Sequence, residues 1–84
     1  MKVHVAQEDI DAGEKGRASD CPIALALRRE LSAGMVRVGY HVVSWNIGGS
    51  SFIADLSNSA KYFVRAFDRG RPVKPFAFVI EGSE

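Results

Sequence analysis

Apolar and polar positions follow two periodicities along this chain. Apolar and polar residues alternate, as in a strand with one buried face, through residues 2–6, 36–42, 52–56 and 73–80. Apolar residues recur every three to four positions, as in an amphipathic helix, through residues 20–34 and 57–70. The pattern predicts the element order β-α-β-β-α-β.

Residues that begin and end helices flank both helical segments. Residues 20–21 cap the first, Pro22 fits its first turn and Gly34 ends it. One of the polar residues 57–59 caps the second, and Gly70 ends it. The second helix carries a complete apolar stripe at i, i+3, i+4 and i+7, made of Ala60, Phe63, Val64 and Phe67.

The elements fit a single α+β domain over residues 1–84, a two-layer sandwich of one sheet and two helices. Right-handed crossovers would give it a ferredoxin-like, split-βαβ topology. Residues 7–20 are predicted as a long polar loop, and residues 46–49 as a hairpin turn. The expected core contains the aromatic residues Phe52, Phe63, Phe67, Phe76 and Phe78.

The alternation in the second strand predicts which side chains leave the core. If Tyr40 and Val42 face the helices, the intervening alternate positions point outward, namely His41, Val43 and Trp45. An outward Trp45 near Arg37 would suit a protein interface, where Trp and Arg are common anchors. The alternative is that the strand end bends and tucks Trp45 under the hairpin.

Composition excludes several classes of protein. The 84 residues are 46% apolar and 25% charged, with a formal net charge of +1, which is ordinary for a globular domain. No apolar run exceeds five residues, so no segment can span a bilayer, and the first residues do not form a signal peptide. A cytoplasmic location is therefore expected. One Cys excludes an intrachain disulfide and a multi-thiolate zinc site.

Charge is segregated along the chain. Five acidic residues lie between Glu8 and Asp20, and five basic residues against one acidic residue lie between Ser57 and Pro75. Bases spaced by four residues form a row on one side of the second helix, and we name Lys61, Arg65 and Arg69 the basic row. The predicted partner-binding residues are Lys61, Arg65, Arg69 and Arg71, followed by Arg37 and Trp45. The alternatives are a merely solvated helix face, and pairing of the row with the acidic segment within the molecule or across a dimer.

Catalytic and metal-binding patterns are mostly missing. Cys21 lies at a helix N-terminus, where the dipole could lower its thiol pKa, but a lone Cys is more often a packed, inert thiol. The acidic segment 9–14 lacks the ligand spacing of a calcium loop, and the glycine-rich segment 48–51 lacks the lysine of a phosphate-binding loop. The sequence therefore predicts a protein that is not an enzyme and has no cofactor or metal.

Three sequence blocks resemble conserved blocks of a family of small, mostly uncharacterised proteins from bacteriophages, prophages and their hosts. They are residues 7–13, residues 21–27 (CPIALAL) and residues 67–76 (FDRGRPVKPF). The resemblance implies a phage or prophage context, in which small proteins often act by binding. With the compact size, the missing catalytic set, the segregated charge and the possible aromatic patch at Trp45, it favours a non-enzymatic accessory protein in the host cytoplasm that binds a host protein, such as a component of a CRISPR–Cas defence complex, and inhibits it. The alternative is a small nucleic-acid-binding protein that uses the basic row. Homodimerisation is compatible with both readings, and no membrane partner is expected.

Overall fold

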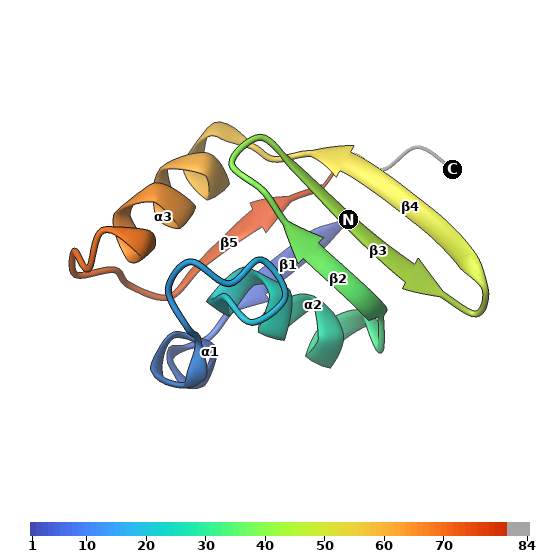
Figure 1. Cartoon of the computed structure of the whole chain (residues 1–84), viewed down its shortest axis with the longest axis horizontal. Helices are drawn as coiled ribbons and strands as arrows, with labels where there is room; N and C mark the ends of the chain where they lie inside the picture. Colours follow the sequence, from blue (N-terminus) through green and yellow to red (C-terminus); the bar gives the residue numbers. More distant parts are fainter. Residues whose placement is uncertain (81–84) are drawn as a thin grey trace.

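Residues 1–80, which the computed structural model describes, form an α+β fold of three helices and five strands, so the predicted class is confirmed (Figure 1). No helix in this range is long and apolar enough to cross a bilayer. The elements in chain order are β1 (Lys2–Val5), α1 (Gln7–Ala12), α2 (Pro22–Leu31), β2 (Gly34–Val38), β3 (Val42–Ile47), β4 (Ser50–Asp55), α3 (Asn58–Asp68) and β5 (Phe76–Val79).

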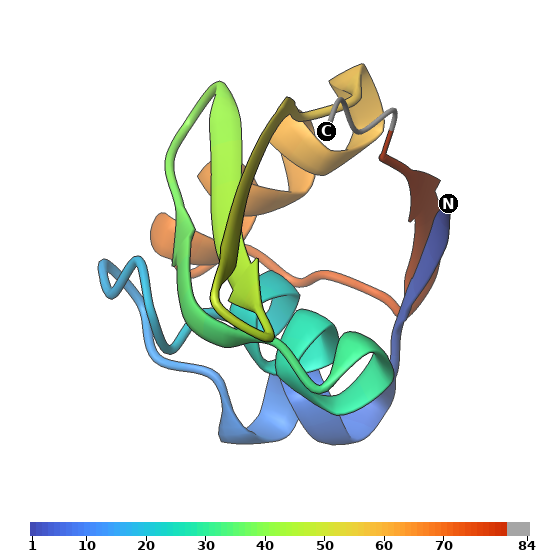
Figure 2. The same ribbon diagram turned by 90° about the vertical axis from the view of Figure 1, so that its right-hand side faces the viewer.

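The strands form two antiparallel sheets, whereas the sequence predicted one. β1 pairs with β5 from the other end of the chain, and β2, β3 and β4 form a meander in that order. The two sheets are separate in Figure 2, with α2 at one end between them. The predicted ferredoxin-like order is wrong, because short turns let β2, β3 and β4 pair with one another while β1 pairs with the last strand.

An unpredicted turn splits the segment 36–42. Gly39 donates its backbone N–H to the carbonyl oxygen of Val42 at 2.8 Å, and the chain reverses between β2 and β3. Val38 then lies directly opposite Val43, and directly opposed residues point to the same face of a sheet. Because Val38 faces the core, Val43 does too. The residues that point inward are therefore even-numbered on β2 and odd-numbered on β3.

This change of phase reverses the predicted orientation of Trp45. Tyr40 and Val42 are exposed, whereas Val43 and Trp45 are buried, Trp45 with only 2% of its surface exposed. The Trp45 ring stacks on Phe52 with 5.6 Å between ring centroids. The prediction that Trp45 faces outward and binds a partner is therefore wrong, and its indole is part of the core.

The segment 7–20 contains the short helix α1, which the sequence analysis placed in a loop. The hydrophobic periodicity of these residues is weak, because Ile10 is the one large apolar side chain of the helix that packs against the core. Asp9 fixes the helix instead, since its carboxylate accepts the Ala6 N–H at 2.8 Å and pairs with Arg29 of α2 at 2.5 Å. Gly13 follows the helix where a Cβ atom would lie 2.7 Å from the Pro22 ring, so only glycine fits there.

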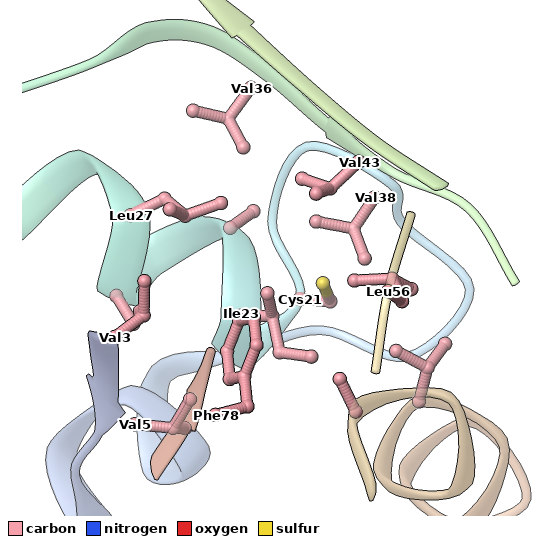
Figure 3. Close-up of a cluster of buried hydrophobic side chains, with 14 of the residues drawn as sticks. Val3, Val5, Cys21, Ile23, Leu27, Val36, Val38, Val43, Leu56 and Phe78 are labelled. Atoms are coloured by element: carbon pink, nitrogen blue, oxygen red, sulfur yellow. The ribbon is translucent and has the colours of Figure 1, made fainter. Parts of the chain in front are cut away.

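The core lies between the two sheets and the helices. Ile23 and Leu27 of α2 are fully buried and point toward apolar residues of both sheets, such as Val3, Val36 and Phe78 (Figure 3). Of the predicted core aromatic residues, three are buried and two are partly buried against the core: Phe63, Phe67 and Phe78, then Phe52 and Phe76.

Candidate partner-binding surface

The sequence predicted the orientation of α3 correctly. Ser57 caps the helix, since its Oγ accepts the Ala60 N–H at 3.2 Å. The stripe made of Ala60, Phe63, Val64 and Phe67 is buried. The opposite side carries the basic row, in which Arg65 and Arg69 are exposed and Lys61 is half-buried. The row therefore faces solvent over the length of α3.

Acidic residues near the start of the chain pair with other cations. Asp9 pairs with Arg29, Asp20 pairs with Arg28 and Arg17, and Glu14 also pairs with Arg17. The Asp9 hydrogen bond is the main cause of a raised pKa for the Arg29 guanidinium. No ion pair within residues 1–80 includes a member of the basic row or Arg71. Pairing of the row with the acidic segment within the molecule, one half of an alternative above, is therefore absent from this part of the chain, and pairing across a dimer stays a prediction.

Asp68 is the one carboxylate on α3, and its hydrogen bonds go to other elements and not to the basic row. Its Oδ1 accepts the backbone N–H of Gly16 at 3.0 Å, and its Oδ2 accepts the hydroxyl of Tyr40 at 3.2 Å. Asp68 thus connects α3 to the loop after α1 and to the turn between β2 and β3. These two hydrogen bonds compete with any pairing between Asp68 and Arg65, one turn earlier on the helix.

A hollow of about 350 Å³ opens beside the C-terminal half of the row. It is lined by Tyr40 and His41 from the β2–β3 turn and by Arg65, Asp68 and Arg69 from α3. Arg guanidinium groups bind carboxylates and phosphates in a bidentate manner, so the two arginines suit an oxyanion, whereas the Asp68 carboxylate in the same lining opposes one. The predicted outward position of His41 is confirmed, whereas Tyr40 was predicted to face the helices and Asp68 was not singled out. Gly39, which breaks the strand, was the sequence signal for the turn that carries Tyr40 and His41.

The other predicted partner-binding residues lie on different elements of the fold. Arg71 is exposed directly after α3, where its backbone N–H closes the helix end on the Ala66 carbonyl. Arg37 is exposed on β2 between the buried Val36 and Val38, so it points away from the core on another element than the row. The structure thus brings the basic row and Arg71 together on one segment and places Arg37 elsewhere.

We expect Asp68→Ala to loosen the loop after α1. The variant loses both hydrogen bonds, and bonds to a charged group contribute about 1.5–3 kcal/mol each when buried and less on an exposed surface such as this. The Gly16 amide should then exchange hydrogen faster by about tenfold, a change of ~1.4 kcal/mol, while the amides of β3 keep their protection. Asp68→Asn, which retains one acceptor oxygen, is the control. Unchanged exchange at Gly16 in Asp68→Ala would contradict the role of Asp68.

Cys21 caps α2 but lies in the core. Its side chain is buried, and its sulfur lies among core side chains in Figure 3. Burial raises the pKa of the Cys21 thiol, and this effect outweighs the hydrogen bonds from the Ala24 and Ile23 amides that lower it. The dipole-activated thiolate considered above is therefore wrong, and the alternative of a packed thiol is confirmed.

The labelling of Cys21 by a maleimide should be slow in the folded protein. At pH 8 we expect a rate at least about 100-fold below that of the urea-unfolded chain, because the thiol is both shielded and protonated. Since the pKa is raised, the folded rate should increase only at a more alkaline pH than that of a free thiol, whose pKa is about 8.5. Native labelling within seconds at neutral pH would contradict the buried position.

Within residues 1–80 no three His, Cys, Asp or Glu side chains lie together as metal ligands. Comparison of the chain with protein-family models, with curated proteins and with solved structures gives no match.

Proposed function

We propose that this chain functions by binding another protein, and that the basic row engages an acidic surface of that partner. The observation that carries the proposal is that three cations without an ion pair in residues 1–80 lie together on the solvent-facing side of one helix. Arg17, Arg28 and Arg29 each have a carboxylate within 4.0 Å, whereas the row has none among residues 1–80. Positive side chains that face solvent on one helix create a local potential that attracts acidic surfaces.

The sequence resemblance supplies the biological setting of the proposal. We infer a non-enzymatic accessory protein of a phage or prophage, acting in the host cytoplasm on a host or defence-system protein. A component of a CRISPR–Cas complex is the example we favour, and inhibition would follow from occupying its surface. The small size of the domain supports this role, because about 800 Å² per partner is enough for a stable interface.

Direct binding of nucleic acid is the second candidate. The spacing of Lys61, Arg65 and Arg69 favours it, because bases one helical turn apart can contact successive phosphates. Such binding would weaken steeply with salt, since each neutralised phosphate releases counterions. A net charge of only +1 is low for a nucleic-acid-binding domain, so protein binding remains the better-supported reading.

Affinity purification from a bacterial host lysate separates the two candidates. The tagged protein is used on lysate with and without nuclease, and protein and nucleic acid are both measured in the eluate. Protein binding predicts a discrete host protein, recovered equally after nuclease treatment. Nucleic-acid binding predicts instead that all partners are lost after nuclease treatment. It also predicts that the affinity for nucleic acid, measured by mobility shift, falls about tenfold or more when the salt concentration is raised moderately.

A further inference from the structure

An apolar groove lies beside the exposed side of α3. Its volume is about 590 Å³, and it separates the N-terminal half of α3 from the extended segment 72–76. The groove walls are mostly apolar and aromatic, with contributions from Tyr62, Phe63, Pro72, Val73 and Phe76. Lys74 is the one charged side chain that lines the groove within residues 1–80.

Tyr62 connects this groove to the basic row. It is 69% exposed, although large aromatic side chains are usually buried. Tyr62 lies three residues before Arg65 and seven before Arg69, so all three share one side of α3. Tyr and Arg together are the side chains that most often dominate binding energy in protein interfaces. The groove and the row therefore form one continuous surface, with Tyr62 at their boundary.

We propose that the groove takes an apolar side chain from an acidic segment of the protein partner. The proposal rests on the proposed function and adds the form of the partner's binding segment, an apolar anchor flanked by Asp or Glu. Charge complementarity selects this occupant, since the groove has the basic row on one side and Lys74 on the other, and no carboxylate from residues 1–80 lines it. An anchor that is buried in the groove supplies apolar contact, and the flanking carboxylates meet the cations.

A peptide-display selection on the full immobilised chain tests this proposal. Random peptides selected on the wild-type protein should share a Leu, Phe or Trp flanked by Asp or Glu. Their affinity should fall at least tenfold for Tyr62→Ala, which removes one wall of the groove, and for Ser59→Glu. The new carboxylate of Ser59→Glu lies at the groove in the first turn of α3, where the helix dipole favours it, so the fold is retained.

Ser51→Glu is the matched control, because it adds the same charge at an exposed position on β4 outside the groove and should leave affinity unchanged. Selected peptides that are acidic but lack an apolar anchor, and that ignore Tyr62→Ala, would overturn this inference and leave the proposed function standing. Peptides without acidic residues, or binding that is insensitive to Arg65→Glu, would overturn both. Preferential binding of a single-stranded oligonucleotide that competes with the peptides would also overturn the assignment.

Discussion

Replacing Trp45 with alanine is expected to lower the free energy of unfolding by about 3–5 kcal/mol, the usual cost of truncating a large buried aromatic side chain. Trp45 is 2% exposed and stacks on Phe52, so the variant loses both buried area and an aromatic contact. Domains of this size have a total stability of roughly 4–13 kcal/mol, so much of the variant should be unfolded at 37 °C. Urea unfolding followed by circular dichroism measures the difference.

Two further measurements separate a core Trp45 from a surface one. Trp45 is the only tryptophan in the chain, so its fluorescence reports one site. Native emission should be blue-shifted and poorly quenched by acrylamide, and both properties should be lost on unfolding. Tyr62→Ala, at a 69% exposed aromatic residue, is the control and should change stability by less than about 0.5 kcal/mol. A loss below 1 kcal/mol for Trp45→Ala would contradict the burial.

Reversing two charges in the basic row is expected to lower partner affinity at least about 100-fold, equivalent to ~2.7 kcal/mol. The variant is Lys61→Glu/Arg65→Glu, which turns attraction into repulsion at two positions of the proposed interface. The fold should tolerate both changes, because Arg65 is exposed, Lys61 is half-buried, and neither has an ion pair within residues 1–80. Binding of the purified partner, measured by calorimetry, gives the result.

The matched control for this pair uses single charge reversals. Arg65→Glu and Lys2→Glu change the net charge equally, but Lys2 is exposed on β1, which carries no member of the basic row. We expect Arg65→Glu to weaken binding at least tenfold, and Lys2→Glu to change it less than twofold. Equal weakening by both variants would mean that the partner senses only overall charge. No weakening by either would remove the basic row from the interface.

The sequence predicted those parts of the fold in which local signals agree with the final packing. In α3 the cap at Ser57, the apolar stripe and the turn at Gly70 all act within the helix, and the structure has all three. The hairpin turn predicted at residues 46–49 is also local. It lies between β3 and β4, where Gly48 and Gly49 adopt the positive φ angles of 56° and 87° that a tight hairpin requires.

Two of the errors arose where long-range contacts decide the structure, and a third arose at the local turn at Gly39. A long-range pair with Arg29, together with a local hydrogen bond to Ala6, fixes Asp9 in α1, and no periodicity in residues 7–12 predicts that pair. The reversal at Gly39 moved Trp45 from the predicted surface into the core, because one extra turn changes which face every later residue of β3 occupies. The pairing of β1 with β5 joins opposite ends of the chain, where the sequence offers no register signal.

Only the part of the candidate surface that lies on α3 could be predicted from the sequence. Helical spacing placed Lys61, Arg65 and Arg69 correctly, and the same spacing places Tyr62, which the sequence analysis did not consider, on their side of α3. Tyr40, His41 and the segment 72–76 reach this surface only through tertiary packing. The row could therefore be found from the sequence, whereas the hollow and the groove beside it could not.

The state of the arginine side chains is the most direct test of the proposed surface. Nuclear magnetic resonance of the arginine Nε–Hε groups distinguishes an ordered guanidinium from one that exchanges freely with water. In the isolated protein we expect an ordered Arg29, held by Asp9, and mobile Arg65 and Arg69. On addition of the purified partner, Arg65 and Arg69 should become ordered while Arg29 stays unchanged. If both are already ordered in the isolated protein, or stay mobile in the complex, the basic row is not the binding surface.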